Sequence, residues 1–366
     1  MKTINDNVHL FVHRVLFNGY PIQNECSVHC NVLASPRNNF DNNLIYYDDY
    51  YGRFFRGWFL NDVSAVYGKP VSLYNHGATI NLQIADFLQV PYRLIPIYKA
   101  NNCSEIKVAI KQMEAFSPNH TFLLRGQNRI YFLKRDIEEK IELYGHSEVR
   151  EPSFLPSFQR KELDYDKTVS IWHNVCALLI NELVKDGSNQ KRNDDLLFYR
   201  NIEGFHALAL GLAQHYGLPS IGLDLTDDLN VALWFAIYDA HYSNREPVTA
   251  DLISGDNNEA TIFVFRCPRL SIFKYPEFEQ YAGAHRPIAQ KAYFNHCGWG
   301  LSKNQLALNL ACGFRVNSSF AEELPNNFIR QLFPSVKEDR VLRILLRIKE
   351  LYQETELGEM LDSIYL

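Results

Sequence analysis

The segment that decides the fold is Ala213-Gln214-His215-Tyr216-Gly217-Leu218-Pro219. Apolar residues precede it, and their spacing predicts a helix over 208–216. Gly217 suits the left-handed conformation that ends many helices, and Pro219 prevents the helix from resuming. The segment therefore predicts a helix end that is followed at once by a new element.

A buried strand and a second helix are predicted directly after this turn. Residues 221–225 are apolar except for Asp224, which is the pattern of a short strand with a carboxylate near its end. Either Asp227 or Asp228 is expected to cap the next helix, which spans 231–238. A helix end, a strand end and a helix start therefore converge, and such places commonly hold a small-molecule pocket.

Polar side chains gather at this convergence, and they are Gln214, His215, Tyr216, Asp224 and Thr226. Burial among apolar neighbours is costly for them unless they pair with each other or with a ligand. His215 is predicted to be a general base, because imidazole titrates near neutrality, or else to pack in the core. Since His215 and Tyr216 point about 100 degrees apart on a helix, only one is expected to face the pocket squarely. Asp224 is expected to pair with His215 or with an arginine.

Four ordered pieces of the chain resemble a known family. They are Leu124-Arg125-Gly126-Gln127, Leu155-Pro156-Ser157-Phe158-Gln159-Arg160, the central stretch from Gln214 to Ala236, and Arg286 to Phe294. Together they resemble the FRG domain, a bacterial and phage family, over about residues 105–300. A literal Phe55-Arg56-Gly57 lies outside this order and is interpreted as surface or packing sequence.

The resemblance extends the candidate site beyond the central stretch. Arg125 follows an apolar strand and is suited to fork onto a phosphate or carboxylate, with a structural salt bridge as the alternative. Gly126 would let a ligand approach the backbone closely, and Gln290 offers a donor and an acceptor to an amide or base edge. The predicted catalytic residues are His215 and Asp224. The predicted ligand-binding residues are Arg125, Gly126, Gln127, Gln214, Tyr216, Thr226 and Gln290.

The composition of the 366-residue chain argues against several classes of function. Its hydrophobic fraction of 46% and charged fraction of 22% are ordinary for a folded protein. A net charge of -5 gives no broad basic footprint for nucleic acid. The sequence holds no apolar run of the ~18 residues that a membrane span needs and no signal-peptide core, so a cytoplasmic protein is expected. The cluster Cys26-Ser27-Val28-His29-Cys30 lacks a second pair at zinc-finger spacing, and no metal site is predicted.

The pattern along the chain predicts an α+β fold. A mixed central sheet is expected from the regions near Thr121, Ile221 and Thr261, with helices packed against it. Composition divides the chain into three parts. These are residues 1–104, of unknown function, the FRG-like residues 105–300, and a helical C-terminal extension over residues 301–366.

The order of a strand with Arg125, a polar motif and a late strand with Gln290 is similar to the layout of ADP-ribosyltransferases, a likeness of layout alone. It implies a nucleotide-like ligand, with NAD as the substrate of ADP-ribosyl transfer or of NAD hydrolysis, in a bacterial toxin or phage-defence setting. The alternative is a non-catalytic module that senses a ligand or binds a protein partner. The sequence leaves open whether the protein is an enzyme. It has neither a Gly-x-Ser-x-Gly elbow nor a Gly-x-x-x-x-Gly-Lys-Ser/Thr loop.

Overall fold

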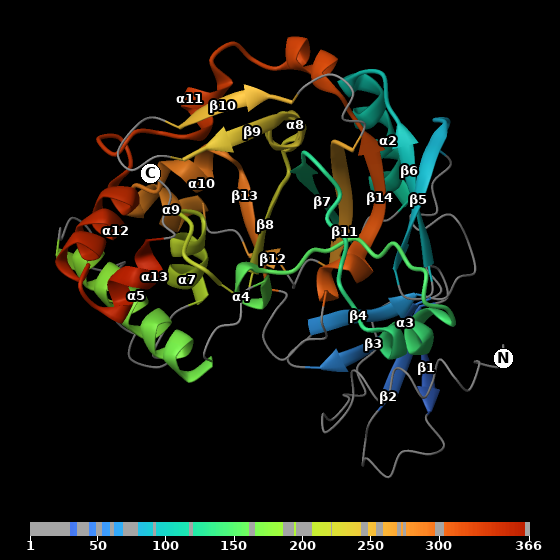
Figure 1. Cartoon of the computed structure of the whole chain (residues 1–366), viewed down its shortest axis with the longest axis horizontal. Helices are drawn as coiled ribbons and strands as arrows, with labels where there is room; N and C mark the ends of the chain where they lie inside the picture. Colours follow the sequence, from blue (N-terminus) through green and yellow to red (C-terminus); the bar gives the residue numbers. More distant parts are fainter. Residues whose placement is uncertain are drawn as a thin grey trace.

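Helices pack around an eight-stranded sheet in the computed structural model (Figure 1). The residues that the structure describes are 30–34, 44–48, 53–58, 62–68, 80–90, 93–116, 120–160, 165–185, 194, 207–220, 222–242, 248–253, 259–268, 272–273, 276–296 and 304–362.

The strands of the large sheet lie in the order β12–β13–β8–β7–β11–β14–β6–β5. Their bounds are β5 (Ile84–Val90), β6 (Arg93–Lys99), β7 (His120–Gln127), β8 (Gly222–Thr226), β11 (Thr261–Pro268), β12 (Ile272–Phe273), β13 (Ala292–His296) and β14 (Leu310–Arg315). Neighbouring strands are antiparallel except for β14 and β6, which are parallel. The predicted α+β class is confirmed, and the three regions expected to form the sheet supply β7, β8 and β11, which lie next to one another in it.

Alternation along the central strands supplies both faces of this sheet with apolar side chains. In β7, Phe122 and Leu124 enter one core cluster and Leu123 enters another. The helices α2 (Cys103–Phe116) and α8 (Leu229–Ile237) share the first cluster, so they cover that face (Figure 1).

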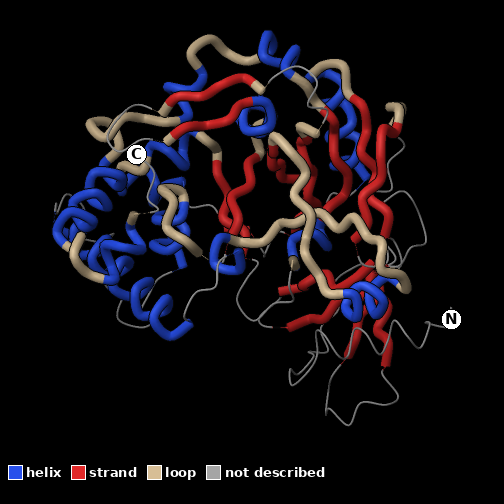
Figure 2. Tube along the Cα trace, viewed as in Figure 1, coloured by secondary structure: helices blue, strands red, loops and turns tan. Residues whose placement is uncertain are grey.

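A second group of helices builds its own core beside the β13 end of the sheet (Figure 2). It contains α5 (Tyr165–Lys185), α7 (Ala207–Gln214), α12 (Arg340–Leu351) and α13 (Glu356–Leu361). Trp172, Leu345 and Phe294 are buried together in this cluster, so β13 joins the helices to the sheet. The remaining helical elements are α3 (Ile137–Tyr144), α4 (Ser157–Arg160), α9 (Pro276–Ala282), α10 (His285–Ala289), η2 (Gln305–Asn309), η3 (Ser318–Glu323) and α11 (Phe328–Leu332).

The large sheet crosses both boundaries that composition suggested. Strands β5 and β6 precede residue 105, and β14 follows residue 300 inside the stretch expected to be helical. The parallel pairing of β14 with β6 joins residues more than 200 positions apart, and composition carries no signal for such a contact. Two further sheets are separate from it. One has four strands, β1 (Cys30–Ala34), β2 (Leu44–Asp48), β3 (Arg53–Trp58) and β4 (Asp62–Gly68). The other is the pair β9 (Tyr238–His241) and β10 (Thr249–Leu252).

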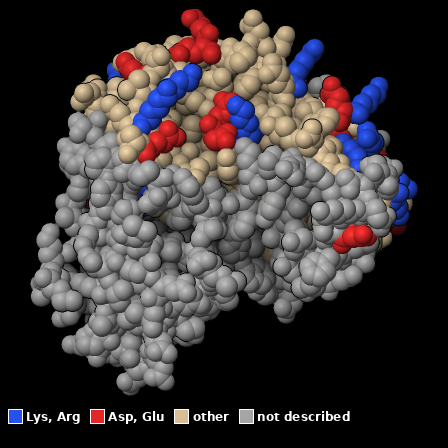
Figure 3. Space-filling view, turned by 180° about the vertical axis from the view of Figure 1, so that it is seen from behind, with Lys and Arg blue, Asp and Glu red and all other residues tan. Residues whose placement is uncertain are grey.

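Acidic and basic side chains are interspersed on the described part of the surface seen from behind (Figure 3). Within the described ranges, none of the helices has the length and apolarity to span a bilayer. Across the same ranges, no group of three or more His, Cys, Asp or Glu side chains is placed to hold a metal ion. Cys26 and His29 of the cysteine cluster lie outside the described residues.

Candidate functional site

The turn after α7 forms one wall of the site. Gly217 has a φ of 104°, and the Leu218 N–H donates to the Ala213 carbonyl at 3.2 Å. The indole N–H of Trp172 donates to the Pro219 carbonyl at 2.7 Å and fastens the turn to α5. The predicted stop at Gly217 is confirmed, although α7 ends at Gln214 and the next three residues form the turn.

The start of α8 forms another wall. Of the two predicted caps, the structure selects Asp228, whose carboxylate accepts from the Asn230 N–H at 2.7 Å. The Thr226 hydroxyl accepts from the Asp228 N–H at 3.0 Å and donates to the Gln290 carbonyl at 2.8 Å. Thr226 therefore ties the strand end to both helices around it.

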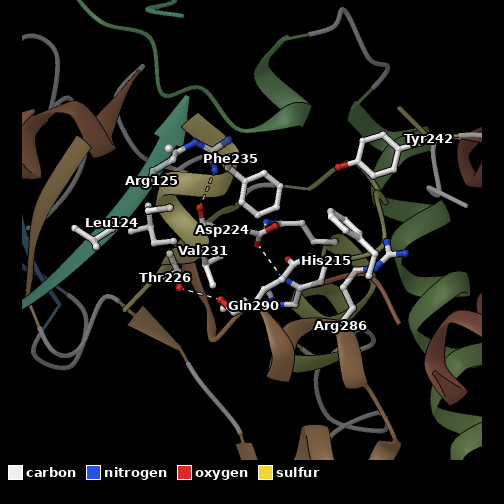
Figure 4. Close-up of a pocket in the computed structure, with 16 residues that line it drawn as sticks. Leu124, Arg125, His215, Asp224, Thr226, Val231, Phe235, Tyr242, Arg286 and Gln290 are labelled. Carbon is white, nitrogen blue, oxygen red and sulfur yellow. Dashed lines mark hydrogen bonds and ion pairs between the residues drawn. The ribbon is translucent and has the colours of Figure 1, made fainter. Parts of the chain in front are cut away.

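Between these walls lies a cavity of about 210 Å³ (Figure 4). The sequence predicted that Arg125, His215, Asp224 and Gln290 line one pocket, and all four line this cavity. The full lining is Leu124, Arg125, Gly126, Gln214, His215, Asp224, Leu225, Thr226, Val231, Ala232, Phe235, Tyr242, Arg286, Gln290, Ala292 and Phe333.

Several polar side chains of this cavity contact Asp224. Its Oδ1 accepts from the Gln214 amide at 2.6 Å and lies 3.1 Å from His215 Nδ1. Arg125 donates from a terminal nitrogen to the Asp224 main-chain carbonyl at 2.7 Å, so it fixes the strand rather than the carboxylate. Figure 4 shows these contacts joining Asp224 to Arg125 and to His215.

The two predicted catalytic residues differ in how far they reach the cavity. The Asp224 side chain is 37% exposed, whereas that of His215 is only 4% exposed. His215 therefore lies behind the carboxylate, and Asp224 is the member of the pair whose side chain reaches the cavity.

Each member of this pair stabilises the charge of the other. Burial opposes ionisation of the Asp224 carboxyl, but the facing His215, Arg125 and the Gln214 amide outweigh it and lower its pKa. Burial likewise opposes protonation of His215, but Asp224 and Glu279 outweigh it and raise the imidazole pKa. The pair therefore favours the charged form of both groups, a carboxylate facing an imidazolium.

Gly126 serves the packing of α8. A Cβ at this position would lie 1.8 Å from the Ala232 carbonyl oxygen and 2.7 Å from the Ala236 nitrogen. Its backbone therefore allows the close approach of a helix, where the sequence suggested the close approach of a ligand.

Two further residues predicted to bind ligand lie outside the cavity lining. Tyr216 is fully buried, and its hydroxyl donates to the buried Asp339 carboxylate at 2.7 Å. Because the chain turns after α7, Tyr216 enters the helical core while His215 stays at the cavity. Gln127, two residues beyond Arg125 in β7, is also absent from the lining.

Gln290 lines the cavity, but it does not lie on a late strand as the sequence suggested. It is the C-cap of α10, and β13 begins only at Ala292. Its side-chain nitrogen donates to the carbonyl of Leu332, the last residue of α11, at 3.1 Å. The Gln290 amide therefore links α10 to α11.

The sequence did not predict that one arginine and three aromatic residues line the cavity. Arg286 is 2% exposed, and its guanidinium carbon lies 5.0 Å from the centre of the Tyr216 ring and 5.5 Å from that of Phe333. Phe333 packs edge-on against both Phe235 and Tyr242. Arg286 begins the piece from Arg286 to Phe294 that resembles the family, and this was a usable signal. Phe333 lies in the loop after α11, and no motif in the neighbouring sequence indicates it.

The comparisons agree with the motifs quoted from the sequence. The FRG domain family model matches residues 125–245, so the motif around Arg286 lies beyond the matched range. No curated protein and no solved structure gives a significant match to the chain. The match begins at Arg125 and includes Gln214, His215 and Asp224, which are polar residues that line the cavity. The chain therefore contains an FRG domain, and that domain supplies the central residues of the candidate site.

Proposed function

We propose that the cavity binds one end of a nucleotide-like ligand, with NAD as the leading candidate. The observation that carries the proposal is the meeting of an ionised carboxylate, two arginines and three aromatic rings in one cavity. A nucleotide offers a partner for each of them, namely sugar hydroxyls, phosphates and a planar base.

The charges of the lining favour an anionic ligand. Arg125 and Arg286 contribute positive charge, and Asp224 is the one carboxylate among the described lining residues. His215 adds to the positive charge whenever it is protonated. A guanidinium suits the planar oxygens of a phosphate, and a net positive wall raises the local concentration of anions.

The size and aromatic content of the cavity suit one moiety of such a ligand. A volume of about 210 Å³ lies below the roughly 300–1,000 Å³ of pockets that enclose a drug-sized molecule. The cavity therefore takes one sugar with its attached ring, while the rest of a dinucleotide extends outside. Phe235, Tyr242 and Phe333 offer ring faces and edges to a base.

Asp224 gives this arrangement a chemical capacity. A carboxylate beside the sugar stabilises positive charge that develops at C1′ as the bond to nicotinamide breaks and the electron pair leaves with nicotinamide. Water then adds its oxygen to C1′ and releases a proton in hydrolysis, or an acceptor nucleophile does so in ADP-ribosyl transfer. This is the activity that the ADP-ribosyltransferase-like layout and the toxin or phage-defence setting of the FRG resemblance imply.

Binding without turnover is the second candidate. It is favoured by the single carboxylate in the described lining, because no second acid stands there to activate an attacking group. In this case the domain senses the ligand and passes the signal to a protein partner.

The test is NAD binding by calorimetry together with nicotinamide release by chromatography. Wild type is compared with Asp224→Ala and with Asp362→Ala, a matched control whose side chain is 72% exposed directly after α13. We expect NAD binding that Asp224→Ala weakens at least tenfold and that Asp362→Ala leaves unchanged.

The two measurements separate the candidates. Nicotinamide release that depends on Asp224 supports the enzyme, whereas binding without release supports the sensor. If the wild-type protein is folded and binds none of NAD, ADP-ribose and nicotinamide mononucleotide, the proposal is wrong.

A further inference from the structure

The two oxygens of the Asp224 carboxylate have different surroundings. Oδ1 faces the Gln214 amide and the His215 ring, at 2.6 and 3.1 Å. Among the described residues, none donates a hydrogen bond to Oδ2. Because the side chain is 37% exposed and lines the cavity, Oδ2 is the acceptor that a ligand meets.

The hydrogen bonds behind Gln214 fix which way its amide faces. The Ser220 hydroxyl accepts from the Gly222 N–H at 3.1 Å and donates to Gln214 Oε1. A hydroxyl has one proton, so this proton is committed to Gln214. With Oε1 held in this way, the amide nitrogen must face Asp224. Ser220 is fully buried, which keeps water from replacing either bond.

Ser157 holds Ser220 in place from a distant part of the chain. Its hydroxyl accepts from the Ser220 N–H at 2.8 Å and donates to the Ser220 carbonyl at 3.4 Å. Ser157 belongs to the Leu-Pro-Ser piece of the sequence and begins α4. This motif residue, which lies outside the cavity lining, is thereby connected to Asp224 through Ser220 and Gln214.

We infer that the pocket selects its ligand by a hydroxyl group that donates to Asp224 Oδ2, and that Ser157 and Ser220 set this polarity through Gln214. The inference rests on the proposed function and narrows it to ribonucleotides over deoxynucleotides. Oδ2 can only accept, so the ligand must supply a donor. The positive charge of Arg125 disfavours an ammonium donor. The aromatic rings take the planar base, and the carboxylate is left for the sugar.

The first test needs no variant of the protein. Calorimetry compares nicotinamide mononucleotide with its 2′-deoxy and 3′-deoxy forms on the full chain. We expect one of the deoxynucleotides to bind about 10- to 100-fold more weakly, the loss of one hydrogen bond to a charged group. In Asp224→Ala the difference should shrink to about twofold. The ligand hydroxyl and the Asp224 carboxylate make one shared hydrogen bond, so once the carboxylate is gone the hydroxyl has no partner to lose.

The second test addresses the positioning residues through a pH profile. Asp224 is faced by His215 from the α7 turn, by Arg125 from β7 and by Gln214, and Arg286 and Glu279 act on His215 in turn. Affinity for nicotinamide mononucleotide should fall as acid protonates the carboxylate. In Ser220→Ala the Gln214 amide is no longer held, so this fall should begin at a higher pH than in wild type.

The control for the second test is Ser170→Ala, which removes an exposed serine hydroxyl on α5. Its pH profile should match wild type. An unchanged profile in Ser220→Ala would overturn the positioning role. Equal affinity for nicotinamide mononucleotide and both of its deoxy forms would overturn the selection by a hydroxyl while leaving nucleotide binding intact. If none of the nucleotides binds to folded protein, the proposed function and this inference both fail.

Discussion

Replacing Gly126 by alanine tests whether this glycine serves helix packing. The new Cβ would lie 1.8 Å from the Ala232 carbonyl oxygen, where a carbon–oxygen contact needs about 3.3 Å. The helix α8 must therefore retreat from β7 by about 1.5 Å, since a main-chain oxygen cannot rotate aside. A gap of that size removes a large share of the dispersion contacts along the helix. We expect a loss of at least about 3 kcal/mol, the upper end of overpacking costs.

Urea unfolding followed by tryptophan fluorescence measures this loss, and Trp234 on α8 reports on the affected helix. The matched control is Gly145→Ala, where φ is 80° and a Cβ would meet nothing within 4 Å. That variant should lose only about 1 kcal/mol, the cost of the left-handed conformation for an alanine. A Gly126→Ala protein as stable as Gly145→Ala would refute the packing role and return Gly126 to the ligand.

Two further predictions concern the core and the ion pair. Tyr216→Phe removes a hydroxyl that donates to the buried Asp339, and it should cost about 1.5–3 kcal/mol in urea unfolding while leaving NAD affinity unchanged; a change of affinity without loss of stability would place Tyr216 in the site after all. The raised pKa of His215 gives stability that is lost as pH rises through that value, and the lowered pKa of Asp224 gives stability that is lost as pH falls through it. The stability difference between wild type and Asp224→Asn should therefore be largest between about pH 4 and 6.5, and a difference that stays flat from pH 3 to 9 would speak against the pair.

Local signals in the sequence predicted the elements that frame the site. Gly217 and Pro219 marked the helix end, and Asp228 was one of two expected caps. These features depend on short-range backbone geometry, which residue type largely determines. Asp224 was expected to pair with His215 or with an arginine, and the structure places His215 at its carboxylate and Arg125 at its main-chain carbonyl.

Contacts between distant parts of the chain were beyond the sequence reading. Phe333 reaches the cavity from the loop after α11, and β14 pairs with β6 across more than 200 residues. Tyr216 was assigned to the ligand because it stands in the motif, but the turn after α7 directs it into the helical core. In each case the deciding partner is remote in sequence, so neither periodicity nor local motif indicates it.

The proposed nucleotide site is tested most directly by a crystal structure of the protein grown with ADP-ribose. We predict electron density for a sugar within hydrogen-bonding distance of Asp224 Oδ2, with phosphate oxygens toward Arg125 or Arg286. Density for ADP-ribose bound elsewhere on the molecule, with this cavity holding only solvent, would contradict it.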